Sequence, residues 1–254
     1  MIPKLLLFDL DFTLLGTNRK ISERTLKALK TAQKKGSLIG FATSRGNTNL
    51  ENLVELVNPD VVMTNGGGSI YLKNQLIHTE TFTLEETKAL LSKAFEVLGP
   101  EAEITIDTVD NLYWNRKDNK SECYAPDATY NDMQDFPEPA MKICIQTTDT
   151  EKANLIASSI KACDILRFSD IPWHKFSNPY ATKGNGLRYL ASHLGIPIQQ
   201  TAAFGDDFPD LSMLQAAGIG IAMKNAPLAV QQAADEVTAS CDEDGVAVWL
   251  EQHL

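Results

Sequence analysis

Residues 4–10 constrain the fold most, because they form a short run of large apolar side chains near the start of the chain. A strand with this little polar alternation is typical of a parallel sheet that is buried on both faces. Comparable apolar runs follow at residues 38–42, 61–63, 201–204, 219–222 and 236–238. Helical patterns separate most of these runs, so the sequence predicts an α/β fold with a Rossmann-like parallel sheet.

The helices are predicted from caps and apolar periodicity. Ser22 is expected to cap a helix that ends at Gly36, and a second helix is expected over residues 47–57. A helix over residues 183–194 should end at the following Gly and Pro.

The middle third of the chain has a different pattern. A hairpin (70–72 and 76–78) precedes it, and Thr83 with Glu86 fits a capping box that opens a helix. Further strands are expected at residues 102–106, 112–115, 141–147, 165–168 and 173–176, with a helix over 150–162 and an irregular excursion over 117–139. We therefore expect an α+β cap over residues 82–182, inserted into a core formed by residues 1–81 and 183–254.

Composition excludes several classes of protein. The net charge of −10 argues against nucleic-acid binding, which needs clustered Lys and Arg, but allows a local pocket for a small anion. No apolar run approaches the length of a membrane helix, and Asp9 and Asp11 interrupt the only stretch that resembles a signal peptide. The four cysteines form no C-x-x-C pair and are expected to be free thiols. We expect a cytoplasmic protein that does not bind membranes.

Asp9 and Asp11 stand at the end of the first predicted strand. Residues two apart on a strand face the same side, so the two carboxylates are expected together. Ligands of open α/β sheets bind at this edge, outside the carboxyl ends of the strands. A simple polar turn would give the same spacing.

Thr43, Ser44 and Lys183 are candidates for binding phosphate. Thr43 and Ser44 follow the second strand, where a hydroxyl and backbone N–H groups suit a phosphate oxygen. Lys183 begins the helix that re-enters the core and offers a point charge. The alternatives are an ordinary helix cap and a solvated lysine.

Asp206, Asp207 and Asp210 follow another apolar strand. Three carboxylates in five residues repel one another unless a positive charge lies between them. Ligands that are all oxygen favour Mg²⁺. An acidic N-cap for the next helix is the alternative interpretation.

Taken together and in this order, these motifs resemble those of the haloacid dehalogenase superfamily of phosphohydrolases. The chain is similar over its whole length to the Cof-like branch, which has a large α+β cap. The resemblance implies that Asp9 is the nucleophile and forms an aspartyl-phosphate, and that Asp11 is the acid and base. It implies that Thr43, Ser44 and Lys183 hold the transferring phosphoryl group. Mg²⁺ would be bound by Asp9, the Asp11 carbonyl and Asp206, with Asp210 either as a further ligand or as a residue that orients the ligands.

The sequence departs from the family pattern at several positions. Phe12 stands where the family usually has Gly, and Ser44 also replaces a commoner Gly. Residues 205–210 correspond to the family motif G-D-N-x-N-D, and Asp207 and Pro209 stand in place of its two Asn. Pro209 therefore offers neither a side-chain amide nor an N–H near the metal. Arg45 fits the family pattern.

Substrate contacts are expected partly from the core and partly from the cap. Arg45 and Asn65 are the core candidates, and Asn65 also fits a tight turn. Arg116, Trp173 and His174 are the candidates from the cap; the alternative for the aromatic residues is packing in the cap core.

Several functions are compatible with these motifs. The first is hydrolysis of a small phosphorylated metabolite such as a sugar phosphate, by a monomer or homodimer. A phosphomutase or glycosyl-phosphate phosphatase would share the fold. A phospho-receiver domain would be about half as long without a cap, and an inactive binding protein would be expected to lack Asp9 or Asp11.

Overall fold

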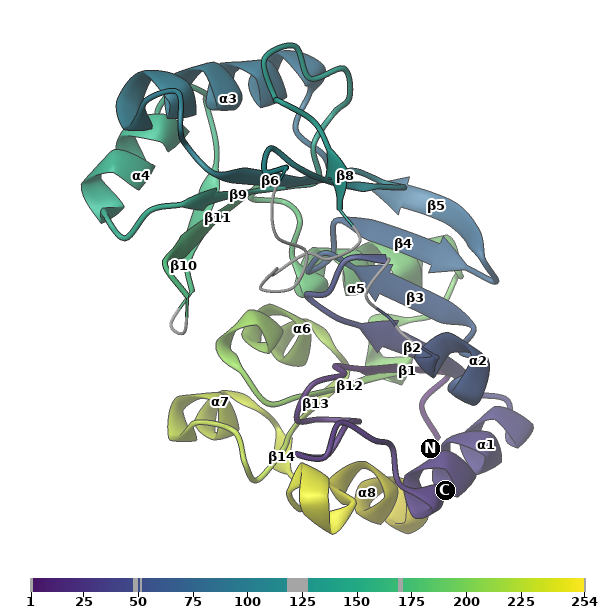
Figure 1. Ribbon diagram of the computed structural model, residues 1–254. Coiled ribbons are helices and arrows are strands. Elements are labelled where there is room, and N and C mark those ends of the chain that lie inside the picture. Colours follow the sequence, from purple (N-terminus) through teal and green to yellow (C-terminus); the bar gives the residue numbers. More distant parts are fainter. Residues whose placement is uncertain (1, 48–49, 51, 118–127, 169–170, 254) are drawn as a thin grey trace. The chain divides into compact units, whose positions relative to one another are not determined.

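A computed structural model describes residues 2–47, 50, 52–117, 128–168 and 171–253 (Figure 1). The chain divides into two compact units, a core of Met1–Thr79 with Ala181–Leu254 and a cap of Glu80–Tyr180. The boundaries expected from the sequence lie two residues from these. None of the helices in the described residues is long and apolar enough to cross a membrane.

The core contains an eight-stranded sheet in the order β14-β13-β12-β1-β2-β3-β4-β5. All neighbouring pairs are parallel except at the hairpin, where β4 runs antiparallel to both β3 and β5. The strands are β1 (Leu5–Phe8), β2 (Leu38–Ala42), β3 (Val61–Thr64), β4 (Ser69–Leu72), β5 (Gln75–Thr79), β12 (Thr201–Gly205), β13 (Ile219–Ala222) and β14 (Glu236–Val237). The predicted α/β class is confirmed.

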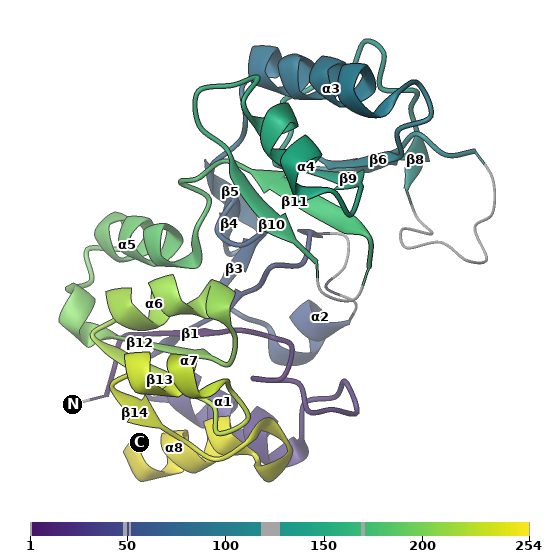
Figure 2. The same cartoon turned by 90° about the vertical axis from the view of Figure 1, so that its left-hand side faces the viewer.

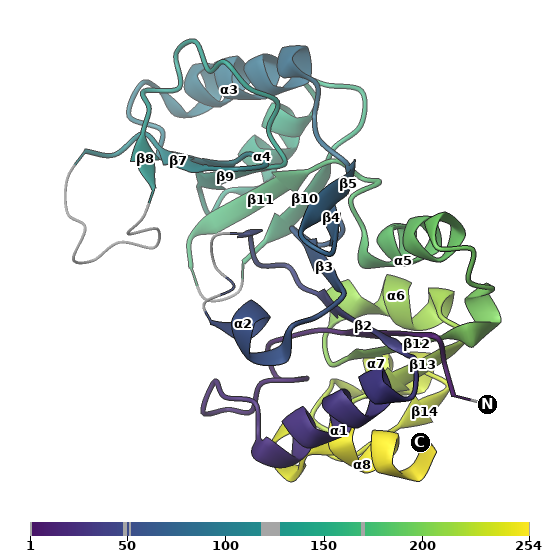
Figure 3. The same cartoon turned by 90° about the vertical axis from the view of Figure 1, so that its right-hand side faces the viewer.

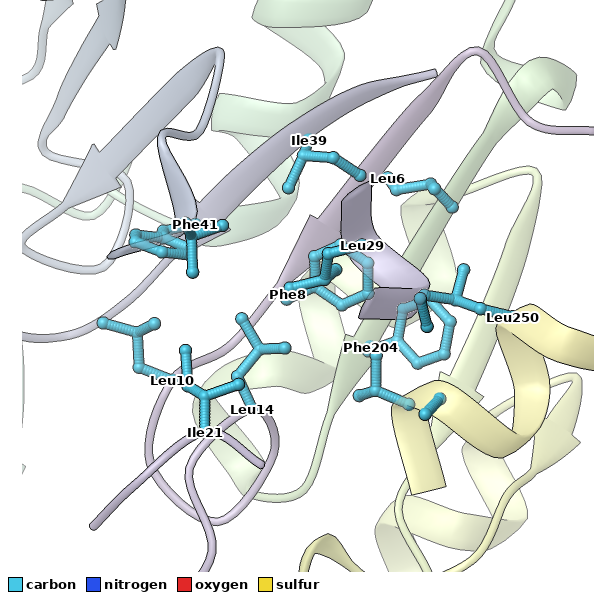
Figure 4. Close-up of a cluster of buried hydrophobic side chains, with 14 of the residues drawn as sticks. Leu6, Phe8, Leu10, Leu14, Ile21, Leu29, Ile39, Phe41, Phe204 and Leu250 are labelled. Atoms are coloured by element: carbon cyan, nitrogen blue, oxygen red, sulfur yellow. The ribbon is translucent and has the colours of Figure 1, made fainter. Parts of the chain in front are cut away.

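Strand β1 is apolar throughout because both of its faces are covered. Leu6 and Phe8 belong to an apolar cluster with α1 and α8, and Leu5 and Leu7 to a second cluster with α5 and α6. Figures 2 and 3 show these helix pairs on opposite faces of the core sheet. In the first cluster Phe8 stacks on Phe204 of the neighbouring strand, with ring centroids 4.8 Å apart (Figure 4).

Helices α1 and α5 of the core begin and end near the expected residues. Ser22 accepts a hydrogen bond from Thr25 N–H and caps α1, as predicted. The core helices are α1 (Glu23–Lys34), α2 (Leu53–Val57), α5 (Lys183–His193), α6 (Leu211–Ala216), α7 (Leu228–Ala233) and α8 (Gly245–His253), and the 3₁₀ turns are η3 (Ile198–Gln200), η4 (Phe208–Asp210) and η5 (Cys241–Glu243).

Helix α2 is shorter than the predicted helix over residues 47–57, part of which lies outside the described residues. It starts only after Asn52, which makes no side-chain cap, and ends at Asn58 in the left-handed conformation. Leu50 and Leu53 are nevertheless buried in the first cluster. The apolar spacing therefore identified the buried face but not the helical extent.

The cap contains a six-stranded sheet in the order β10-β11-β9-β6-β7-β8. Its strands are antiparallel except for the pair β7 and β8. The strands are β6 (Ile104–Asp107), β7 (Leu112–Trp114), β8 (Thr129–Tyr130), β9 (Lys142–Gln146), β10 (Asp164–Arg167) and β11 (Trp173–Ser177). β8 lies inside the predicted excursion, of which residues 118–127 are outside the described residues.

Two helices, α3 (Leu84–Leu98) and α4 (Thr150–Ala157), pack on one face of the cap sheet (Figure 1). The predicted capping box of Thr83 and Glu86 opens α3. The prediction of a helix to residue 162 was wrong, because α4 ends at Ala157. Ser158 Oγ donates to Leu155 O instead, a local bond that competes with helix continuation.

Candidate active site

The polar motifs meet at one edge of the core sheet because their strands are parallel neighbours. β1 lies between β12 and β2, with Phe8 opposite both Phe204 and Phe41. The residues that follow the carboxyl ends of these three strands therefore lie close together. Asp9 follows β1, and Asp206 and Thr43 follow β12 and β2 respectively.

Asp9, Asp206 and Asp210 form a buried carboxylate cluster. Each offers an oxygen within 4.8 Å of the others, and each residue is at most 8% exposed. Asp206 Oδ1 also accepts a 2.7 Å hydrogen bond from Thr13 Oγ1. The sequence analysis missed Thr13; its signal was a hydroxyl two residues after Asp11, at the same sheet edge.

Lys183 brings the matching positive charge into this cluster. Thr182 caps α5, which places Lys183 in the first turn, where its side chain is 2% exposed. Its Nζ lies 2.6 Å from Asp9 Oδ1 and 2.5 Å from Asp210 Oδ1. Burial lowers the pKa of Lys183, but the two carboxylates more than offset this and raise it above its usual value. Lys183 therefore stays charged.

One ammonium does not neutralise three carboxylates. Burial raises the pKa of Asp9 to about 8, against the attraction of Lys183. Burial likewise raises the pKa of Asp206 to about 7, helped by Asp210 and opposed by the hydrogen bond from Thr13. Such shifted groups are typical of functional sites, and they indicate that the cluster has room for further positive charge.

Asp210 is held by three donors. Its Oδ1 accepts from Lys183, and its Oδ2 accepts from the backbone N–H groups of Asp206 (2.9 Å) and Asp207 (3.1 Å). The carboxylate comes this close because residue 205 is Gly: a Cβ there would lie 2.4 Å from Asp210 Cβ. Asp210 thus positions Lys183 and the Asp206 backbone.

The two departures in this motif have structural roles. Asp207 caps the 3₁₀ turn η4, and its Oδ1 accepts from Phe208 N–H at 2.8 Å. Pro209 lies in the first turn of η4, where an N–H has no intrahelical partner to lose. Neither substitution removes a side chain of the carboxylate cluster.

Asp11 lies beside the cluster in a different environment. Its side chain is 44% exposed and forms a two-bond ion pair with Arg45, from Nη2 to Oδ1 at 2.6 Å and from Nε to Oδ2 at 2.9 Å. Arg45, predicted to contact substrate, here orients Asp11. Asp9 and Asp11 therefore have different surroundings: Asp9 is buried beside Lys183, whereas Asp11 is partly exposed and paired with Arg45.

Thr43 and Ser44 form a turn after β2. Thr43 is buried, its N–H donates to Met63 O, and its Oγ1 accepts from Arg45 N–H at 3.1 Å. Ser44 is exposed, and its N–H has no protein acceptor among the described residues. The hydroxyl hydrogen of Thr43 and the Ser44 N–H remain to bind an anion.

The loop containing Asn65 supports this turn from behind. Asn65 has a φ of 52°, and its N–H donates to Arg45 O while Gly66 N–H donates to Thr43 O. Gly67 adopts a φ of +106°, and a Cβ there would lie 2.3 Å from Thr182 O. The expected tight turn is therefore observed, and its backbone is bonded to the turn of Thr43 and Arg45. A contact of Asn65 with substrate stays a prediction.

The candidate residues of the cap have partners within the cap. Arg116 Nη1 lies 3.2 Å from Glu103 Oε1. Trp173 is buried in a cluster with Trp114 and Cys144. His174 is fully buried and bonds through Nδ1 to Thr147 O at 2.8 Å. Their role in binding substrate stays a prediction.

The donor chemistry of the carboxylate cluster fits a magnesium ion. Among the described residues, no protein donor is bonded to the second oxygen of Asp9 or of Asp206. Both oxygens are available for a cation that prefers hard ligands. Both oxygens of Asp210 already accept hydrogen bonds from N–H donors, so Asp210 is less available to a cation than Asp9 and Asp206.

The fold and the site define a phosphatase with a carboxylate-rich centre on a capped Rossmann-like core. The model of the haloacid dehalogenase-like hydrolase family matches residues 6–250, so the chain belongs to this family, as a Cof-like phosphatase.

Relatives match over nearly their full length. A 5-amino-6-(5-phospho-D-ribitylamino)uracil phosphatase from Bacillus subtilis is 28% identical, covering 99% of this chain and 98% of its own. The structure of a sugar phosphatase of HAD subclass IIB is 28% identical, with a TM-score of 0.82 and 98% coverage of both chains. A HAD phosphatase from Bacteroides thetaiotaomicron shares the fold, with 24% identity, a TM-score of 0.85 and coverage of 99% and 95%.

Proposed function

We propose that this phosphatase hydrolyses phosphate monoesters of small metabolites through an aspartyl-phosphate on Asp9, with Mg²⁺ in the carboxylate cluster. The observation that carries the proposal is the cluster itself. Asp9 is buried and held by Lys183 at 2.6 Å, and a separate carboxylate, Asp11, stands beside it in a polar setting.

In the first half of the reaction, Asp9 attacks phosphorus and the ester oxygen leaves. The transferring oxygens gain hydrogen bonds from the Thr43 hydroxyl, the Ser44 N–H and Lys183, which stabilise their charge. Asp11 gives a proton to the leaving oxygen, so that an alcohol departs rather than an alkoxide. The P–O bond to the alcohol breaks as the P–O bond to Asp9 forms.

In the second half, Asp11 takes a proton from water. The water attacks the phosphorus of the aspartyl-phosphate and releases inorganic phosphate and free Asp9. Arg45 orients the ionised form of Asp11, which is the form that accepts the proton from water, since it bonds both carboxylate oxygens.

Asp9 and Asp206, with the Asp11 carbonyl, would hold the magnesium ion. When bound, the ion supplies positive charge that lowers the repulsion between the phosphate ester and Asp9. Asp210 supports this arrangement through the Asp206 backbone.

The leaving group is a small organic alcohol. One relative acts on a phosphoribitylamino-uracil and a structural neighbour is a sugar phosphatase, by their names. We propose sugar phosphates and related phosphorylated polyols as the first compounds to test.

The experiment is phosphate release from a panel of sugar phosphates and one aryl phosphate, with and without Mg²⁺. We expect turnover that needs the ion and that falls at least about 10⁴-fold in Asp9→Asn, as in other enzymes that lose a nucleophile. Turnover of Asp9→Asn within tenfold of the wild type would contradict the proposal. Transfer of phosphate to a second sugar position instead of release would indicate a phosphomutase.

A further inference from the structure

Phe12 combines two features that cost stability. Its backbone has a φ of 59°, a left-handed conformation that bulky side chains rarely adopt, and its residue surface is 54% exposed. Gly, which the family usually has at this position, would adopt that backbone freely. Such strain is typically found at functional sites.

Packing does not explain this residue. Within the described residues, neither apolar cluster of the core sheet includes Phe12. Its backbone is held, because its carbonyl accepts a 2.9 Å hydrogen bond from Asn225 Nδ2. The loop is thus held in a strained conformation in which the Phe12 residue surface remains 54% exposed.

Phe12 stands in the chain beside the candidate catalytic residues. It directly follows Asp11, and the next residue, Thr13, donates to Asp206. Phe12 therefore belongs to the short loop that connects the proton carrier to the carboxylate cluster.

Phe208 is a second exposed aromatic residue at the same edge. It is 58% exposed and follows Asp207 in the loop after β12. Phe12 and Phe208 each lie four residues beyond Phe8 and Phe204, which are paired in neighbouring strands. The Thr13–Asp206 hydrogen bond joins the two loops.

The polar side chains that hold these loops are already engaged. Asn225 donates to Phe12 O and accepts from Cys241 N–H at 2.9 Å, and the Thr13 hydroxyl donates to Asp206. A sugar ring needs several hydrogen-bonding partners, whereas a planar ring needs an aromatic face. The two phenyl rings offer the second kind of surface.

We propose that Phe12 and Phe208 form an aromatic rim that selects phosphate esters whose leaving group carries an aromatic or heterocyclic ring. This inference rests on the proposed function, since the rim acts on the same leaving group. Phe12 and Phe208 are specificity-determining residues, and the reacting atoms are handled by Asp9 and Asp11.

The kinetic test compares 2-phenylethyl phosphate with ethyl phosphate, whose alcohols are similar leaving groups but differ by a ring. We expect the wild type to prefer the phenyl ester in kcat/KM. Phe12→Gly and Phe208→Ala should each reduce this preference by about five- to tenfold. Val237→Ala removes a comparably exposed apolar side chain on β14 and should leave the preference unchanged.

Two further readouts separate this inference from the proposed function and from misfolding. Phe12→Gly should melt at the same or a higher temperature than the wild type, because Gly relieves the backbone strain. Binding of 2-phenylethylphosphonate, measured against ethylphosphonate by calorimetry, should lose the same preference without any turnover. If the wild type binds the phenyl compound better but releases no phosphate from either ester, the proposed function fails and the rim stands.

A wild-type preference below twofold, or a preference unchanged in Phe12→Gly, would overturn the rim. Equal losses on both esters would also overturn it, because they would show a disturbed Asp11 rather than a lost ring contact.

Discussion

Each unit of the molecule contains a largely buried Lys–Asp ion pair, and the two pairs differ in their surroundings. In the cap, Lys142 Nζ lies 3.2 Å from Asp107 Oδ2, on neighbouring antiparallel strands. In the core, Lys183 faces both Asp9 and Asp210, and Asp206 adds a further carboxylate. The cap pair joins one ammonium to one carboxylate. In the core, three carboxylates share one ammonium, which leaves negative charge uncompensated.

Under the proposed function, this difference distinguishes a structural pair in the cap from a functional one in the core. A balanced buried pair needs nothing further to be stable in its fold. An unbalanced cluster is costly unless something positive binds to it, and it persists where that binding is useful. A buried charged residue alone would therefore not identify a candidate active site, because the cap contains one as well. The excess of buried negative charge is found in the carboxylate cluster of the core.

Between the two ion pairs, the largest expected effect comes from removing Lys183. Lys183→Met should lower kcat by about 10³-fold, because the transferring oxygens lose a charged donor. It should also destabilise the core by about 3–5 kcal/mol, since buried carboxylates lose their partner. Lys142→Met is the matched control in the cap and should destabilise the protein while leaving kcat within about twofold. Urea unfolding and phosphate release measure both quantities.

Equal losses of kcat in the two variants would remove the distinction between the two pairs. They would mean that Lys183 acts on activity only through stability.

Asp11→Asn should have the next largest effect. We expect turnover to fall by about 10²-fold on alkyl phosphates, because the leaving oxygen loses its proton donor. The loss in kcat/KM, which reports only the first half of the reaction, should be smaller for an aryl phosphate, whose oxygen leaves without a proton. Unfolding in urea should change little, since the ion pair with Arg45 is partly exposed. An equal loss on both esters would contradict a role in protonating the leaving group.

Magnesium should stabilise the protein in a pH-dependent way. The pKa values of Asp9 and Asp206 are raised from 3.8 to about 8 and about 7 in the metal-free fold. Between the unfolded value of 3.8 and these raised values, the folded chain holds protons that the unfolded chain has released. Without the ion, the free energy of unfolding therefore falls as the pH rises through this range. Mg²⁺ competes with those protons and should bind better at high pH.

Differential scanning fluorimetry measures this effect. We expect millimolar Mg²⁺ to raise the Tm by about 5 °C near pH 8 and by clearly less at about pH 5.5. The same shift at both pH values would contradict binding at the carboxylate cluster. Asp206→Asn is the control variant and should lose most of the shift.

The smallest expected effect is in the cap. Arg116→Met breaks an exposed ion pair with Glu103 and should change stability by no more than about 1 kcal/mol. If Arg116 has no further role, KM for every ester in the panel stays within about twofold. A rise in KM for one ester alone would support the sequence-based prediction that Arg116 contacts substrate.

The sequence was most informative where strand ends carry chemistry. Asp9, Thr43 and Asp206 each follow an apolar run, and parallel pairing is enough to bring such residues to one edge. Lys183 was found from its place at the start of a helix, which is also local information. The fold class and the capping box at Thr83 came from similarly local patterns.

Pairings between distant segments were not predictable in this way. Nothing in the order of residues shows that Arg45 bonds both oxygens of Asp11, or that Thr13 reaches Asp206. The engagement of Asp210 by backbone N–H groups depends on the close approach that Gly205 allows. The end of α4 was also missed: the Ser158 hydroxyl bonds to Leu155 O there, and the N–H groups of Ser159 and Ile160 bond to carbonyls three residues back instead of four.

The most direct test of the central claim is to trap the intermediate on Asp9. Enzyme in turnover with Mg²⁺ and a phosphate ester is quenched with borohydride, which reduces an aspartyl-phosphate to homoserine, and peptide mass spectrometry locates the change. The account predicts homoserine at Asp9, and only when both the ester and the ion are present. Reduction at another aspartate, or an unmodified Asp9 under conditions of steady turnover, would contradict it.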